Sequence, residues 1–146
     1  MLDRITSPEG TLLALVARSG DTPPGVNFIS DPGYPLQVAV NVYASGDAVR
    51  AHRHPDRDLH ISTIQEVLHI DSGRVIADIM DHSGALVQSV PLSGGDTIFF
   101  IAGGHGLRIL EKTKIIEVKQ GPYRGISADK VYLDPPVKGK DAGVRG

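Results

Sequence analysis

The chain of 146 residues contains no cysteine and no tryptophan. The lack of cysteine excludes disulfides, thiolate chemistry, and zinc or iron–sulfur sites built on cysteine. Basic residues (15) do not outnumber acidic ones (17), which argues against a nucleic-acid-binding surface. No apolar run approaches the roughly 18 residues of a membrane span, and the N-terminus does not resemble a signal peptide. We therefore expect a soluble cytoplasmic protein of one domain.

Glycine (17) and proline (10) are frequent, and they separate short segments rich in valine and isoleucine. Many short strands with regular turns are typical of an all-β sandwich or barrel. The expected strands are Thr11–Arg18, Val26–Ser30, Leu36–Tyr43, Ala48–His54, Thr63–Ile70, Arg74–Met80, Ala85–Val90, Thr97–Ala102, Leu107–Glu111 and Lys114–Gln120.

The turn signals and the composition of the C-terminus also predict a local strand arrangement and the extent of the domain. Turn signals divide Thr63–Val90 into three segments, which predicts three strands in a meander. The domain is expected to occupy residues 1–133, with its core motifs between 36 and 120. Residues 134–146 are rich in Gly, Lys and Pro, so we expect a mobile C-terminal tail.

Histidine and glutamate residues mark a candidate metal site. His52 and His54 are separated by one residue, so in an extended strand their side chains point to the same face. Glu66 begins a later expected strand, and His105 lies between two glycines. Imidazole and carboxylate groups together are a ligand set for iron, zinc, nickel or manganese.

The spacing of these residues resembles the two sequence motifs of the cupin superfamily. Gly46, five residues, His52, one residue and His54 are similar to the opening of the first motif, and Glu66, six residues and Gly73 are similar to its close. Eleven residues separate His54 from Glu66, where the usual motif has three or four. The insertion is expected to form a longer loop.

The second motif is similar to the run from Gly95-Asp96 through Gly103 to His105. The resemblance covers about residues 36–120 and implies a jelly-roll barrel, the double-stranded β-helix. It also implies one divalent transition metal (Fe, Zn, Ni or Mn) inside the barrel. The protein ligands implied by the resemblance are His52, His54, Glu66 and His105.

A narrower resemblance lies near the C-terminus. The run Ile116–Tyr123, followed by Asp129-Lys130, is similar to small single-domain cupins of bacterial surface-polysaccharide and sugar-nucleotide gene clusters. The resemblance implies a sugar-like or other polar small molecule as ligand, although a fold alone does not name a reaction.

Further polar residues are candidates for the same site. Glu117 and Lys119 share a strand face with Ile115, and they line a pocket if that face is inward or are surface charges if it is outward. The same question is open for the two faces of Leu36–Tyr43. The catalytic candidates are His60, Tyr43 and Glu117, and the substrate-binding candidates are Arg50, Asn41 and Lys119.

Two classes of function fit these residues. The first is a metal-dependent enzyme on a small sugar-like or carboxylate-bearing substrate, an isomerase, an epimerase or an Fe(II) oxygenase. The second is a cupin that holds a metal or a small molecule without turnover. A barrel that has lost its metal is a third reading. Open sheet edges favour a homodimer, and no nucleic-acid or membrane partner is expected.

Overall fold

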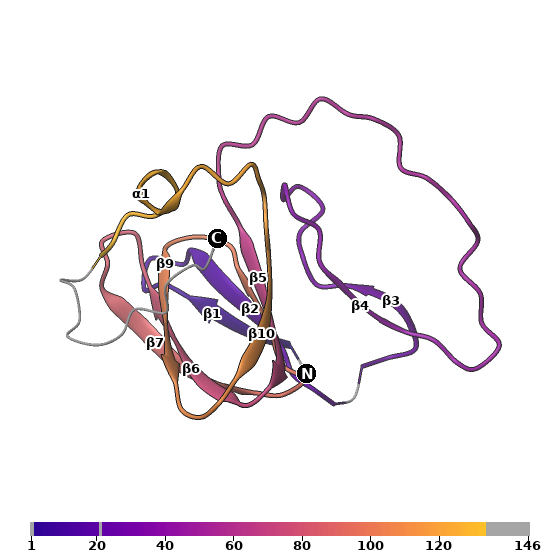
Figure 1. Ribbon diagram of the computed structural model, residues 1–146, viewed down its shortest axis with the longest axis horizontal. Helices are drawn as coiled ribbons and strands as arrows, with labels where there is room; N and C mark the ends of the chain where they lie inside the picture. The colour runs from indigo at the N-terminus through magenta and orange to yellow at the C-terminus, as the bar shows by residue number, and fades with distance from the viewer. Residues whose placement is uncertain (1, 21, 134–146) are drawn as a thin grey trace.

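The computed structural model describes residues 2–20 and 22–133 of the chain (Figure 1). The expected tail at 134–146 lies outside the described residues. The described chain is antiparallel β structure with one short helix, α1 (Ile126–Asp129). The prediction of an all-β fold is therefore confirmed. In this part of the chain no helix has the length and apolar character needed to span a membrane.

The strands form two larger sheets and a separate hairpin. The five-stranded sheet has the order β1 (Leu2–Thr6), β2 (Leu12–Ala17), β8 (Thr97–Phe100), β5 (Glu66–Ser72) and β10 (Lys114–Lys119). The three-stranded sheet has the order β7 (Leu86–Ser93), β6 (Arg74–Met80) and β9 (Gly104–Ile109). The hairpin consists of β3 (Gly25–Phe28) and β4 (Ala39–Val42).

The two larger sheets enclose a common apolar core. Alternate residues of β6, among them Val75, Ala77 and Ile79, are fully buried, as period-2 alternation in a strand with one buried face predicts. They belong to the same cluster as Leu68 and Ile98 of the five-stranded sheet. The core thus lies between the sheets and holds them face to face.

The five-stranded sheet is also covered on its outer face. A second cluster joins Leu15 and Phe99 of the central strands to Tyr34, Leu36 and Val38, which precede β4. The middle of the sheet is therefore buried on both sides. This explains why β2 (LLALVA) and β8 (TIFF) are nearly continuous apolar runs rather than alternating ones.

The expected meander is confirmed at its second turn, where β6 and β7 pair as antiparallel neighbours, and wrong at its first turn. The turn at Gly73 does not return β5 onto its neighbour, because β5 pairs with β8 and β10 whereas β6 pairs with β7 and β9. Gly73 has a positive φ of 91°, and a Cβ there would lie 2.6 Å from the carbonyl oxygen of Lys112. The sequence signals the turn correctly, but it does not reveal that the chain passes from one sheet to the other.

The expected strand Ala48–His54 is also wrong. These residues lie in a long exposed segment, 43–64, that leaves β4 and loops away from the sheets before β5 begins (Figure 1). Within residues 48–54 the only large apolar side chain is Val49, so neither face of a strand there gains much from burial. Leu36–Tyr43 is a strand only over Ala39–Val42, because the residues before it pack on the outer face.

Candidate functional site

The inner face of the five-stranded sheet changes from apolar to charged along β10. Ile115 packs against the core, Glu117 pairs in register with Leu68, and Lys119 pairs in register with Glu66. The alternation of strand side chains puts Ile115, Glu117 and Lys119 on one face. That face is inward, which decides between the two readings left open by the sequence.

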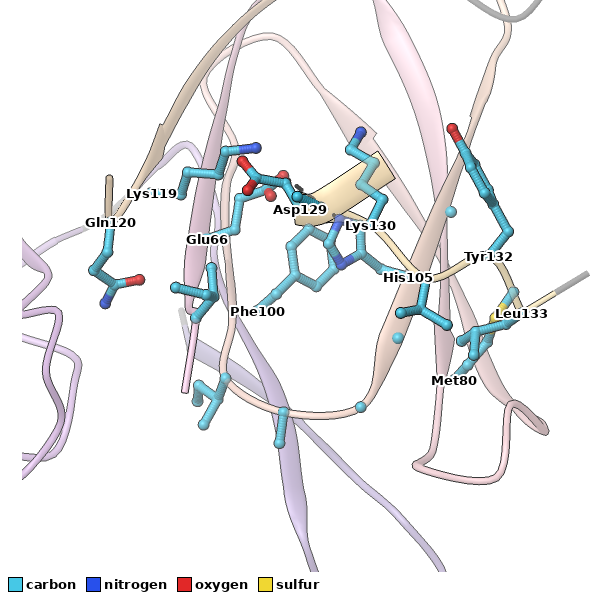
Figure 2. Close-up of a pocket in the computed structure, with 18 of the residues that line it drawn as sticks. Glu66, Met80, Phe100, His105, Lys119, Gln120, Asp129, Lys130, Tyr132 and Leu133 are labelled. Atoms are coloured by element: carbon cyan, nitrogen blue, oxygen red, sulfur yellow. Dashed lines mark ion pairs between the residues drawn. The ribbon is translucent and has the colours of Figure 1, made fainter. Parts of the chain in front are cut away.

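His105 reaches this charged end from the opposite sheet (Figure 2). Its Nε2 lies 3.5 Å from Oε1 of Glu66, and the two side chains are 30% and 16% exposed. The imidazole stacks on Phe100, with ring centroids 3.9 Å apart and ring planes 7° apart. One face of the ring is thus fixed by an aromatic partner and its edge by a carboxylate.

Two glycines before His105 allow this approach. Gly103 has a positive φ of 72°, and a Cβ there would collide with the carbonyl oxygen of Met80. A Cβ on Gly104 would collide with the side chain of Leu133. The glycine-rich segment therefore lets β9 start close to β6 while the C-terminal described residues pack against it.

The charges around Glu66 keep it ionised. Burial acts to raise the pKa of its carboxyl group, but the hydrogen bond and charge of His105, with the charges of Lys119 and Lys130, outweigh burial and lower the pKa below its ordinary value. Lys119 forms an ion pair with Glu117 at 3.1 Å. Desolvation lowers the pKa of Lys119, yet its acidic neighbours raise it overall, so this ammonium stays charged.

Two adjoining cavities meet at the His105–Glu66 pair. One has a volume of about 520 Å³ and is walled on its far side by residues 120–133, which include α1. The other, of about 310 Å³, lies between β5, β9 and β10. Both are lined by Glu66, His105 and Lys130. The site is therefore an open, polar pocket at one end of the two sheets (Figure 2).

The structure gathers four of the candidate residues at this pocket, namely Glu66, His105, Glu117 and Lys119. Six others line neither cavity in the described part of the chain, namely Asn41, Tyr43, Arg50, His52, His54 and His60. Asn41 lies in β4 of the separate hairpin. The other five belong to the exposed segment that follows it.

The expected metal ligands do not form one donor set in this arrangement. His52 and His54 lie near each other, with ring centroids 5.3 Å apart, but both are exposed. The His52 Nδ1 donates a hydrogen bond to the carbonyl oxygen of Arg50 at 2.7 Å. Among residues 2–20 and 22–133, no group of three or more His, Asp or Glu side chains could hold a metal ion. Of the four expected ligands, Glu66 and His105 lie together in the pocket, with Oε1 and Nε2 3.5 Å apart.

The residues that line the pocket but were not among the candidates include Phe100, Asp129 and Lys130. Phe100 is placed beside Glu66 by the register of β8 against β5, and one sequence does not reveal strand register. Asp129 and Lys130 come from the chain after β10, where no periodic pattern marks a structural element. The sequence signals that pointed to this pocket were the motif spacing around Glu66 and His105 and the shared face of Glu117 and Lys119.

No family model, curated protein or solved structure matches this chain. The evidence for function is therefore the geometry of the pocket and the residues that line it.

Proposed function

We propose that the chain binds a small polar molecule in this pocket and that His105 and Glu66 transfer a proton to or from it. The single observation that supports this is the 3.5 Å approach of the two side chains where the cavities meet. Imidazole both donates and accepts protons near neutral pH. The Glu66 carboxylate orients the ring and stabilises the charge that it gains.

The lining indicates the chemistry of the ligand. Charges of both signs face the cavities, with Lys119 and Lys130 near the carboxylates of Glu66 and Glu117. Such a surface suits a molecule with several hydroxyl groups or with a carboxylate, because each polar atom of the ligand meets a partner of the right kind. A sugar-like or carboxylate-bearing compound is the proposed ligand class.

A second candidate is the metal-binding cupin suggested by the sequence. The observation that favours it is that two of its four expected ligands, Glu66 and His105, already meet at one place. Two facing antiparallel sheets with a pocket at one end are compatible with a jelly roll. The metal-dependent reading requires His52 and His54 to leave their present positions, so we derive no chemical step from it.

A ligand screen tests the first proposal. We would record the histidine ring signals by NMR while adding a panel of monosaccharides, sugar phosphates and small dicarboxylates. The His105 signals should move on binding, and the movement should be lost in Glu66→Gln. The matched control is His82→Gln, because His82 lies exposed in a turn. Absence of any shift across the panel, or an equal response in Glu66→Gln, would contradict the proposal.

Metal content tests the second candidate. The protein would be incubated with Fe(II), Zn(II), Ni(II) or Mn(II), desalted, and analysed by mass spectrometry of the metal. Near-stoichiometric metal that is lost both in His52→Ala/His54→Ala and in Glu66→Gln supports the four-residue site. A protein that binds none of these metals would contradict the metal-binding candidate and leave metal-free binding of a small molecule as the proposed function.

A further inference from the structure

Residues 121–133 form a strap over the open end of the pocket. The chain leaves β10, passes through α1 and crosses the end of the two larger sheets (Figure 1). The backbone N–H of Arg124 donates to the carboxylate of Asp129 at 3.3 Å, and those of Ala128 and Asp129 donate to the carbonyl oxygen of Gly125. Among the described residues, no hydrogen bond joins the strap to either sheet. The strap can therefore open without breaking a backbone ladder.

One apolar side chain anchors the far end of the strap. Leu133 packs against Gly104 and Gly84, near Met80 (Figure 2). Gly104 does not have a left-handed φ, so its backbone alone does not require glycine. A Cβ there would collide with Leu133, and the glycine therefore makes room for this side chain. Leu133 remains 47% exposed, so opening the strap costs little buried apolar surface.

The carboxylates of the pocket already have partners within the protein. Glu66 lies beside His105, and Glu117 forms an ion pair with Lys119 at 3.1 Å. Asp129 accepts hydrogen bonds from the backbone of the strap, and its charge also acts on Lys119. The negative charges that face the cavities are thus compensated by neighbouring groups.

Two cations of the strap are not compensated in this way. Arg124 and Lys130 both line the larger cavity, and Lys130 also lines the smaller one. Among residues 2–20 and 22–133, neither side chain has an ion-pair partner. A guanidinium and an ammonium group together suit a carboxylate or a phosphate, whose oxygens accept charge-assisted hydrogen bonds. The group that would compensate these two cations is therefore an anion.

We propose that the ligand carries a carboxylate or phosphate group, that Arg124 and Lys130 bind this group, and that the strap thereby closes over the ligand. The inference rests on the proposed function, because it concerns the end of the same ligand that points away from His105. An anion that binds only the closed arrangement shifts the strap toward that arrangement. Recognition of the anionic end is thus coupled to the exclusion of water from His105 and Glu66.

Limited digestion with chymotrypsin tests the closure, with inorganic phosphate and malonate as the probes. The strap contains Tyr123 and Tyr132, which are 55% and 68% exposed, and cleavage after them reports the open strap. Phe28 and Tyr43 are exposed outside both cavities and serve as reference sites in the same digest. Cleavage of the strap should slow by about tenfold when the anion exceeds its Kd tenfold. Cleavage at the reference sites should not change, and sodium chloride at equal ionic strength is the salt control.

Substitutions show whether the two cations are responsible. Arg124→Gln/Lys130→Gln should abolish the protection by the anion. The matched control is Arg57→Gln/Lys112→Gln, which removes the same two kinds of charge from exposed positions outside both cavities. Leu133→Ala should speed cleavage of the strap without anion, because it removes the anchor. Thermal unfolding of each variant is recorded first, and the two single variants replace Arg124→Gln/Lys130→Gln if that variant does not fold.

The results divide clearly between support and contradiction. Protection by phosphate alone or by malonate alone supports the proposal and identifies the anionic group. Three results would overturn it: no protection by either probe, equal protection in Arg124→Gln/Lys130→Gln, or a strap that resists cleavage in the parent while the reference sites are cut. The digest does not report on His105, so failure of the anion site and failure of the ligand screen are separate results.

Discussion

The imidazole at the centre of the pocket is held on one of its faces by a neighbouring aromatic ring. Phe100 is almost fully buried and lies parallel to the His105 imidazole. Its neighbour Phe99 points to the opposite face of the sheet and packs in the outer cluster. These adjacent residues of β8 therefore pack on opposite faces of the sheet. Phe100 contacts His105 in the pocket, and Phe99 packs in the outer apolar cluster.

Replacing Phe100 with leucine should release the imidazole while leaving the strand in place. We expect a loss of stability that includes about 0.5–1.5 kcal/mol from the aromatic pair. The His105 ring protons should also lose the upfield shift caused by the stacked ring, as measured by NMR. Phe99→Leu is the matched control, because it removes a buried ring from the same strand without touching His105. An unchanged His105 spectrum in Phe100→Leu would contradict the stacking.

Asp96 is a structural residue rather than part of the pocket. Its carboxylate accepts hydrogen bonds from the backbone N–H groups of Ser19 and Ser93, at 2.9 and 3.0 Å, and from Arg18 at 3.2 Å. Burial acts to raise the pKa of Asp96, but these backbone hydrogen bonds and Arg18 lower it below the ordinary 3.8. The Gly-Asp pair that resembles a motif start thus ties the turn before β8 to the end of β2.

This lowered pKa predicts the acid response of the fold. A carboxyl group whose pKa falls on folding stabilises the protein above its ordinary pKa, and this contribution is lost as the pH drops through the lowered value. Asp96→Asn should lower the free energy of unfolding by about 1–3 kcal/mol at pH 7. It should also flatten the loss of stability below about pH 4. Urea denaturation at pH 7 and pH 3 measures both. An equal deficit at the two values would exclude the ionised carboxylate as the cause.

At the scale of single elements, the glycine-rich approach to β9 is the most constrained connection. Gly103 combines a left-handed φ with the close carbonyl of Met80. Gly106, three residues later, has neither constraint. The sequence run around His105 therefore contains glycines with different requirements, which the letters alone do not distinguish.

Alanine substitutions should separate these two glycines. Gly103→Ala forces a side chain into a left-handed conformation and onto a backbone oxygen, so we expect a loss of stability of order 1–3 kcal/mol. Gly106→Ala should be neutral or stabilising by up to about 1 kcal/mol, because it reduces the freedom of the unfolded chain. Thermal unfolding of the two variants is the measurement. Similar melting temperatures would show that the turn at Gly103 is not strained by a side chain.

Much of the element order could be predicted from the sequence, because alternation and turn residues are local properties. Alternation predicts that Ile115, Glu117 and Lys119 share one face of β10, and that Glu66 shares a face with Leu68 and Ile70. It does not predict that the β10 face is the inward one. The sequence could not reveal which strands become neighbours, since register and sheet assignment depend on contacts between distant segments. At Ala48–His54 the pattern of polar and apolar residues satisfied the strand period, but the segment has almost no apolar surface to bury.

At the scale of the whole molecule, the apolar outer layer continues beyond its cover. Register pairs connect Leu15, Phe99, Val67 and Val118 in one row across four strands. The first three belong to the covered cluster. Val118, with Ile116 beside it on β10, is about half exposed. An apolar row that ends at a free sheet edge is the surface on which we expect a homodimer to form.

Substituting Val118 with lysine should weaken this association. The lysine charge interrupts the apolar row and would have to be desolvated if a second copy packed on this edge. We therefore expect the apparent mass in sedimentation velocity to fall to that of the monomer. Leu86→Lys is the matched control, because Leu86 is also an exposed apolar side chain in an edge strand, but of the other sheet. A parent protein that is monomeric at every concentration, or a dimer that persists in Val118→Lys, would contradict the expected surface.

Because the five-stranded sheet is covered by apolar side chains on both faces, hydrogen exchange in its central strands can measure the stability of the whole domain. The amide groups of β2 and β8 are bonded to strands on both sides and shielded by apolar layers on both faces. Local opening does not expose them to water, so hydrogen exchange at these amides requires unfolding of the whole domain. The slowest exchange rates in the molecule therefore report its global free energy of unfolding without added denaturant.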